Sequence, residues 1–188
     1  MNTVDKKKQA QQYFDQAEQH HIRGELEHAA ELYIKSIELY PTAKAYTWLG
    51  WAYSMMGRLQ EAIEECQNAI RTDPNFGNPY NDIGAYLIEL GEDSAAISWL
   101  ERAIRAPDYE SRAFPHMNLA RIWESQLRWK KAIFGYKEAL RENPDYKQAF
   151  IALKKLFHLV YSVLKSSLIS GRIEEIKLIN LLFLASIK

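Results

Sequence analysis

Apolar residues recur along most of the chain at the three- and four-residue spacing of amphipathic helices. The segments with this spacing come in pairs, and a glycine separates the members of a pair at Gly24, Gly57 and Gly91. Glycine readily adopts the left-handed conformation that ends many helices, so each of these positions predicts a turn. The alternation of apolar and polar residues that indicates strands is absent from the sequence. The pattern therefore predicts an all-α chain of helix pairs.

The segment 46–55 differs from an ordinary amphipathic helix because it carries apolar residues on two opposite sides. One side has the i, i+3, i+4, i+7 spacing and consists of Tyr46, Leu49, Gly50 and Tyr53. The other side consists of Trp48, Trp51 and Met55. Packing against one partner helix requires a single apolar stripe, so the second stripe is available for another contact.

Small and apolar residues also recur at a longer period of 34 residues, which indicates internal repeats. Gly50 and Ala62 return as Gly84 and Ala96, and insertions or deletions fall only between units. The recurrence defines four units at about 10–42, 43–76, 77–110 and 113–146. One helix pair cannot bury its apolar face alone, so successive pairs are expected to stack.

The repeated unit resembles the tetratricopeptide repeat family, whose pattern is W-x₂-L-G-x₂-Y…A-x₃-F…P. The second unit matches it at Tyr46, Leu49, Gly50, Tyr53, Ala62, Cys66, Ala69 and Pro74. The fourth unit departs from it, with Leu127 where a glycine is usual. The resemblance covers residues 10–146 and implies a right-handed superhelical solenoid of antiparallel helix pairs with C-terminal capping helices.

The chain outside the repeats is divided into three further parts. Residues 1–9 are polar and are expected to be a flexible N-terminal segment, and 147–157 resembles the helix that commonly caps the last repeat. Residues 158–188 lose the repeat pattern and form an apolar, helical C-terminal tail. This tail could fold back on the last repeat, pair with another copy, or occupy a groove or lipid surface. A tail foreign to the domain is a fourth alternative.

The resemblance implies that the first helix of each unit lines a concave groove that binds extended or helical peptides. The expected groove residues are Phe14, Thr47, Trp48, Trp51, Met55, Asn78, Asn81, Asp82, Phe114, Met117, Asn118 and Arg121. Tryptophan and methionine would bury apolar side chains of a ligand, and the asparagine amides would pair with its backbone. The alternative is that Trp48 and Trp51 pack between neighbouring first helices as part of the core.

One subgroup of the family grips the C-terminal carboxylate of heat-shock chaperones with lysine, asparagine and arginine side chains. In one register the corresponding residues here are Phe14, Glu18, Trp48, Asn78 and Asp82. In the other they are Thr47, Trp51, Asp82, Phe114 and Asn118. Neither set contains the basic pair that a buried carboxylate requires, so an adaptor of that type is not expected.

Composition narrows the function classes. The 24 basic and 24 acidic residues balance, and basic residues are not clustered with aromatics, so a nucleic-acid partner is not expected. The single cysteine, Cys66, and the polar N-terminus indicate a cytoplasmic protein without a signal peptide. No apolar run reaches the roughly 18–20 residues of a membrane span.

No catalytic motif is present, and the five histidines are scattered without the spacing of metal ligands. We therefore expect no enzyme activity, no cofactor and no metal. Trp99, Trp129 and Cys66 are expected to pack within the repeats. The sequence predicts a non-enzymatic protein–protein interaction module, a scaffold, adaptor or chaperone-like protein, that binds a peptide or helix of a partner in its groove. The alternative is a structural self-assembly protein that forms homo-oligomers through the apolar residues 172–187.

Overall fold

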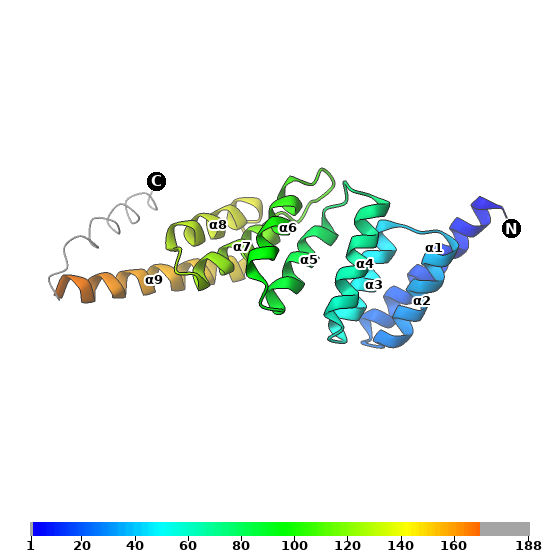
Figure 1. Ribbon diagram of the computed structural model, residues 1–188, viewed down its shortest axis with the longest axis horizontal. Helices are drawn as coiled ribbons and strands as arrows, with labels where there is room; N and C mark the ends of the chain where they lie inside the picture. Colours follow the sequence, from blue (N-terminus) through cyan, green and yellow to red (C-terminus); the bar gives the residue numbers. More distant parts are fainter. Residues whose placement is uncertain (1, 170–188) are drawn as a thin grey trace. The chain divides into compact units, whose positions relative to one another are not determined.

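The computed structural model describes residues 2–169, so the apolar run at 172–187 lies outside the described residues. Every regular element within this range is an α-helix, which confirms the predicted all-α fold of helix pairs. The helices are α1 (Thr3–Ile22), α2 (Leu26–Leu39), α3 (Ala43–Met55), α4 (Leu59–Thr72), α5 (Asn78–Glu89), α6 (Asp93–Arg105), α7 (Ala113–Ser125), α8 (Trp129–Glu142) and α9 (Lys147–Ile169) (Figure 1).

The chain divides into two compact units, Met1–Pro115 and His116–Lys188. In the first unit, α1 packs on α2, α3 on α4 and α5 on α6, and each pair also packs on the next. In the second unit, residues of α7, α8 and α9 share one buried cluster that includes Ala120, Tyr136 and Leu156. Consecutive pairing of short helices is the arrangement that the 34-residue period predicts.

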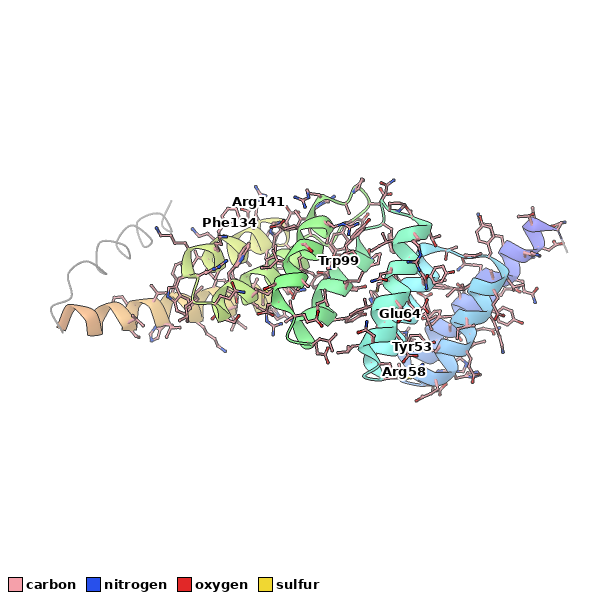
Figure 2. The ribbon with its side chains drawn as sticks, viewed as in Figure 1. Tyr53, Arg58, Glu64, Trp99, Phe134 and Arg141 are labelled. Atoms are coloured by element: carbon pink, nitrogen blue, oxygen red, sulfur yellow. The ribbon has the colours of Figure 1, made fainter. Side chains whose placement is uncertain are left out.

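The four turns inside the helix pairs share one backbone geometry. Gly24, Gly57 and Gly91 have φ of 77–78°, the left-handed conformation that the sequence predicted for them. In the second pair, the Arg58 amide donates to the Tyr53 carbonyl at 2.9 Å, and its guanidinium lies 4.2 Å from the Tyr53 ring centroid (Figure 2). The fourth turn uses Leu127 instead, with φ of 58°. The turn geometry therefore persists even where the residue does not favour it.

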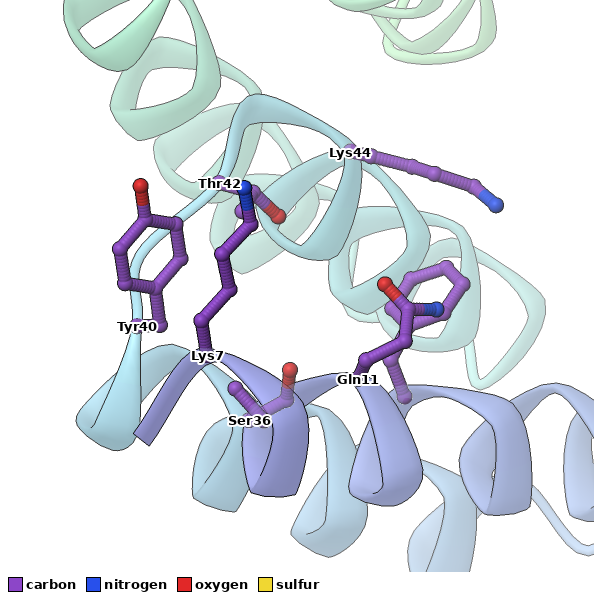
Figure 3. A pocket seen from close by; sticks show the side chains of 8 residues that line it. Lys7, Gln11, Ser36, Tyr40, Thr42 and Lys44 are labelled. Carbon is purple, nitrogen blue, oxygen red and sulfur yellow. The ribbon is translucent and has the colours of Figure 1, made fainter. Parts of the chain in front are cut away.

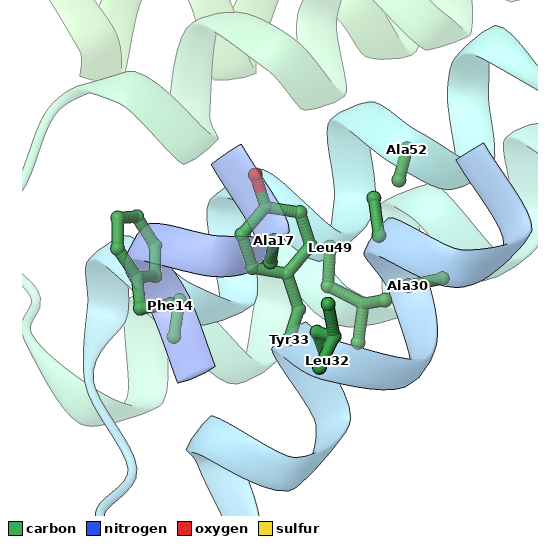
Figure 4. Packing of buried hydrophobic residues seen from close by; sticks show 9 residues of the cluster. Phe14, Ala17, Ala30, Leu32, Tyr33, Leu49 and Ala52 are labelled. Carbon is green, nitrogen blue, oxygen red and sulfur yellow. The ribbon is translucent and has the colours of Figure 1, made fainter. Parts of the chain in front are cut away.

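Small residues allow the two helices of a pair to approach closely. Ala17, Ala29 and Ala52 are fully buried in the core that α1, α2 and α3 share, where Tyr33 fills the space between the pairs (Figure 4). A Cβ atom on Gly50 would lie only 3.1 Å from the Ala62 carbonyl oxygen. The recurring glycine and alanine positions therefore mark helix crossings, as their period indicated.

The outermost helices extend beyond their predicted bounds. The expected flexible segment 1–9 is replaced almost entirely by α1, which begins at Thr3 because the Asn2 side chain accepts a hydrogen bond from the Asp5 amide at 2.8 Å. The capping helix predicted over 147–157 continues without interruption to Ile169. Val160 is 8% exposed and packs in the same cluster as Leu156, so the apolar core continues past residue 157.

A short extended contact joins two inter-pair loops of the first unit. Phe76 and Asp108 form an isolated parallel bridge, in which the Gly77 amide donates to the Asp108 carbonyl at 3.0 Å. A Cβ atom on Gly77 would lie 2.2 Å from that of Tyr109, so only glycine fits at this position. The bridge involves too few residues for a pattern of alternating polarity to indicate it.

Candidate functional site

The second apolar stripe of α3 forms part of the wall of a pocket. Trp48 and Trp51 stack with ring centroids 4.3 Å apart and an interplanar angle of 28°. A pocket of about 200 Å³ lies beside them and is lined by Glu18, His21, Ile22, Tyr33, Trp48 and Trp51. These side chains come from α1, α2 and α3, so the stacking of the first two helix pairs creates the pocket.

Each of these tryptophans has both a packing role and a pocket-lining role. Trp48 packs against the core of the first two pairs, and its ring centroid lies 6.0 Å from that of Phe14. Both tryptophans remain partly exposed at the pocket. Trp48 therefore packs partly against the core between the repeats, and both tryptophan rings also line the pocket.

Trp51 is held in place by a hydrogen bond to the next helix pair. Its Nε1–H donates to Asp82 Oδ2 on α5 at 2.5 Å, and Asn81 Nδ2 donates to the other carboxylate oxygen at 3.4 Å. Removal from water raises the pKa of Asp82 to about 7, although both hydrogen bonds act to lower it. The carboxylate thus sets the orientation of a pocket-lining ring.

His21 connects the pocket with its exposed edge. Its Nδ1 lies 3.3 Å from the Tyr33 hydroxyl and its Nε2 lies 3.1 Å from the Met55 sulfur. Burial lowers the pKa of His21, so the imidazole is largely uncharged near neutral pH. Met55 is 61% exposed at this edge, where its flexible thioether can adapt to a bound apolar group.

Two expected groove residues are buried in the first unit. Phe14 is only 3% exposed, and its ring belongs to the core. Thr47 is fully buried, and its hydroxyl donates to the Ala43 carbonyl at 2.8 Å. Phe14 also contacts the pocket-lining Trp48. The helical positions of Phe14 and Thr47 suggested the groove side, but packing within the first two helix pairs buries both side chains.

The remaining expected residues are not among the lining residues of this pocket. Asn78 and Asn81 belong to α5, where Asn78 is partly exposed and Asn81 is buried. On α7, Phe114 is 47% exposed. The second unit contains Met117, which packs partly buried in its cluster, together with Asn118 and the exposed Arg121.

Sequence reasoning missed three pocket residues: His21, Ile22 and Tyr33. Tyr33 was assigned to the space between pairs, and the same position lets its ring face the pocket. His21 and Met55 lie 34 residues apart, one more than the 33 residues that separate the equivalent turn glycines Gly24 and Gly57. Near-equivalent positions of adjacent repeats become neighbours when the repeats stack, so this spacing was the available signal.

The described residues also bear on metal binding, membrane insertion and thiol chemistry. Among the described residues, no group of three or more histidine, cysteine, aspartate or glutamate side chains could hold a metal ion. No helix within residues 2–169 is both long and apolar enough to cross a membrane. Cys66 is fully buried, and this burial raises the pKa of its thiol, which disfavours the reactive thiolate.

Comparisons with known proteins identify the repeat. The model of the tetratricopeptide repeat family matches residues 43–76, the second predicted unit. An inactive TPR repeat-containing thioredoxin, TTL3 of Arabidopsis thaliana, is 28% identical over 138 residues, which cover 70% of this chain and 20% of that protein. DnaJ homolog subfamily C member 7 of Mus musculus is 26% identical over 58% of this chain and 22% of its own length. The chain therefore spans about a fifth of these relatives.

Solved structures with the same fold share little sequence with this chain. PilF of Pseudomonas aeruginosa superposes with a TM-score of 0.77 at 20% identity, over 84% of this chain and 72% of PilF. MamA gives a TM-score of 0.66 at 20% identity, over 88% of this chain and 95% of MamA. YrrB, described as a TPR protein with an unusual peptide-binding site, gives 0.60 at 20% identity over 87% of this chain and 79% of YrrB.

Proposed function

Because this chain is a tetratricopeptide repeat protein, we propose that it is a non-enzymatic protein–protein interaction module that holds a peptide or helix of a partner at Trp48 and Trp51. The module would act as a scaffold, adaptor or chaperone-like protein in the cytoplasm. The partner is a protein segment rather than a nucleic acid, since the chain carries equal numbers of basic and acidic residues.

The observation that carries this proposal is the pocket of about 200 Å³ beside the stacked tryptophans. The repeat pattern accounts for Leu49 and Gly50 on the opposite side of α3, but it does not require Trp48 or Trp51. Large aromatic side chains at a preformed pocket are typical anchors of protein interfaces, at about 2 kcal/mol or more each. A leucine- or phenylalanine-sized side chain of the partner would fill the pocket.

The test begins with 12-residue peptides selected from a random phage library on the full-length protein. Their Kd values are then measured by fluorescence anisotropy on purified variants. A loss of about 2 kcal/mol predicts a roughly 30-fold weaker Kd for Trp51→Ala. The control is Trp99→Ala, because Trp99 on α6 stacks on Arg102 outside the pocket (Figure 2). Circular dichroism verifies that both variants keep their helix content.

Equal affinities for the wild type, Trp48→Ala and Trp51→Ala would contradict the proposed pocket, provided that the variants stay folded. A peptide that loses affinity only with Trp99→Ala would place the binding surface on the outer helices. Trp51→Phe sharpens the result, since it keeps a ring at the pocket and removes the hydrogen bond to Asp82.

Self-assembly is the second candidate, and the exposed side of α9 favours it. Phe150, Ile151, Leu159 and Val163 are each 45–59% exposed, although they are apolar. A second copy could cover them. Light scattering of the full chain and of a 1–169 truncation tests this idea. The truncation keeps these four residues and the buried Val160, and it removes the apolar run 172–187. Oligomers of both proteins would place the contact on α9, and oligomers of the full chain alone would place it in that run. A monomeric full chain would exclude self-assembly.

A further inference from the structure

A second, smaller cavity lies between α1, α2 and the start of α3 (Figure 3). Its volume is about 50 Å³, and its lining residues are Lys7, Ala10, Gln11, Phe14, Ser36, Tyr40, Thr42 and Lys44. One water molecule requires about 10–15 Å³ of such volume, so the space suits a group the size of a carboxylate. Two lysines line this cavity, and none of its lining residues is acidic.

Two hydroxyl groups face the same space. Ser36 is only 3% exposed, and its hydroxyl makes no hydrogen bond within the described residues. Figure 3 shows this hydroxyl pointing between Lys7 and Gln11. Thr42 Oγ1 accepts a hydrogen bond from the Ala45 amide at 3.1 Å, which leaves the hydroxyl hydrogen able to donate. No fully buried side-chain oxygen of the described residues lacks a partner, so the Ser36 hydroxyl is open to solvent at the cavity, where it can bond to a group that enters.

The two lysines differ in how firmly they are held. Lys7 has no ion pair in the described part of the chain, and its ammonium lies 5.6 Å from the centroid of the Tyr40 ring. Lys44 is paired with Glu18 at 3.5 Å, and both side chains are substantially exposed. Exposed pairs at such distances contribute little free energy, so an incoming anion can compete for Lys44.

The nearest carboxylates are outside the cavity lining. Glu18 is bound to Lys44, and Asp15 accepts a hydrogen bond from Gln11 Nε2 at 2.7 Å. Both oppose an anion, and Glu18 opposes it more because it shares a lysine with the cavity. Among the lining residues themselves, Lys7 and Lys44 are the charged side chains and the Ser36 and Thr42 hydroxyls add donors, so the cavity wall favours an anion.

We propose that this cavity binds a carboxylate, supplied by an acidic side chain of the same peptide that is held at Trp48 and Trp51. That the carboxylate belongs to this peptide rests on the proposed function. Lys44 links the two places, because its ammonium lies 4.3 Å from the Phe14 ring centroid and 5.0 Å from that of Trp48. Neither Lys7 nor Lys44 occupies a position of the chaperone-tail clamp. The favoured ligand is therefore a segment that carries an acidic residue beside an apolar anchor.

The first test uses sodium acetate as the probe, with acetamide as its uncharged counterpart, at constant ionic strength. In ¹⁵N-labelled full-length protein, acetate should cause saturable NMR shifts of the Ser36, Thr42 and Lys44 amides, and acetamide should not. Lys7→Gln should weaken acetate binding about tenfold, as expected for loss of one charge-assisted hydrogen bond. Glu18→Gln should strengthen it about twofold, because Lys44 is released.

The matched control is Lys8→Gln, which removes the same charge from the next residue of α1 without altering the cavity lining. Equal effects of Lys7→Gln and Lys8→Gln, or no saturable shift, would overturn the site. Inorganic phosphate binding more than tenfold tighter than acetate would overturn the carboxylate assignment in favour of a phosphoryl group.

The second test separates this site from the aromatic pocket. A selected peptide with a glutamate beside its apolar anchor should lose about tenfold in affinity when that glutamate becomes glutamine, and the loss should vanish in Lys7→Gln. Trp51→Ala should weaken peptide binding roughly 30-fold and leave the acetate response intact. Acetate binding without any gain from the peptide glutamate would overturn only the link between the two sites.

Discussion

In the α3–α4 and α7–α8 pairs, different residues allow the two helices to cross closely. In the α3–α4 pair, Gly50 lies on the first helix and Glu65 lies beside it on the second. A Cβ atom added to Gly50 would lie 3.8 Å from that of Glu65. Seventy residues later the roles are exchanged, with Ala120 on the first helix and Gly135 on the second. A Cβ atom on Gly135 would lie 2.9 Å from that of Ala120. In these two pairs one of the two facing positions is therefore a glycine, and either helix can carry it.

The same two pairs also differ in what fills the core and how the turn is made. Cys66 is replaced by Tyr136, and both are almost completely buried. Tyr136 additionally donates a hydrogen bond to the Glu124 carboxylate. At the turn, Gly57 is replaced by Leu127 in the same left-handed region. The two repeats therefore differ in which buried side chains and turn residues stabilise them.

The largest expected effect is the loss of Tyr136. Replacing a buried aromatic residue by alanine leaves a cavity, so Tyr136→Ala should lower the free energy of unfolding by about 3–5 kcal/mol. Cys66→Ala removes a single buried sulfur atom and should cost about 1 kcal/mol. Urea unfolding followed by circular dichroism measures both. Similar losses would show that the two cores are equivalent despite their different volumes.

The exchanged glycine provides the second test. Gly135→Ala should destabilise the protein by about 1–3 kcal/mol, because Ala120 and the backbone of α7 cannot move away easily. Adding Ala120→Gly recreates the arrangement of the α3–α4 pair and should recover most of the loss. A double-mutant cycle by urea unfolding measures the coupling. Purely additive effects would contradict the exchange.

Substitutions at the two turns should change the free energy of unfolding less, and with opposite signs in the two pairs. A left-handed conformation costs an L-residue roughly 1–2 kcal/mol, while glycine loses about 0.5–1 kcal/mol of chain entropy on folding. Leu127→Gly should therefore stabilise the protein by up to about 1 kcal/mol, since this leucine is 67% exposed. Gly57→Ala should destabilise it by about 1 kcal/mol, although its Cβ atom would meet nothing within 4 Å. Thermal unfolding compares the two signs.

The last comparison concerns the hydrogen bond from Trp51 on α3 to Asp82 on α5. In the α7–α8 pair, the bond between Tyr136 and Glu124 lies within the pair instead. The folded-state pKa of Asp82, about 7, exceeds the ordinary value near 3.9 of an unfolded chain. Between about pH 4 and pH 7 the folded protein therefore binds the extra proton, so this group makes stability fall as pH rises through that window. Above pH 7 its contribution becomes constant.

Asp82→Asn should remove this component of the pH dependence, which is measured as the difference in urea midpoint between pH 4.5 and pH 7.5. Glu64→Gln is the control, because Glu64 is an exposed carboxylate on α4 (Figure 2). If the Asp82→Asn and wild-type profiles run parallel, the carboxylate titrates as an ordinary solvated group.

The fold could be predicted from the sequence because its signals are local or periodic. Gly57 predicts its turn from backbone preference alone, and Gly50 and Ala62 predict a crossing from their period. The start of α1 was placed too late because a single cap at Asn2 is a weak signal beside a polar segment. The division of α3 into two apolar sides also follows from helical geometry, so Trp48 and Trp51 could be singled out from the sequence as residues outside the repeat pattern.

The candidate sites depended on contacts between helices that no spacing along the chain specifies. Phe14 and Trp48 were both expected in the groove, yet only Trp48 lines the pocket, because the Phe14 ring is buried in the core of the first two helix pairs. Ser36 and Lys7 become neighbours of one cavity although 29 positions separate them in the sequence. The sequence by itself determined the helices, their turns and the side of α3 that is free. Only the tertiary structure decided which side chains meet there, since helix crossings and side-chain rotamers are set by packing among all the helices.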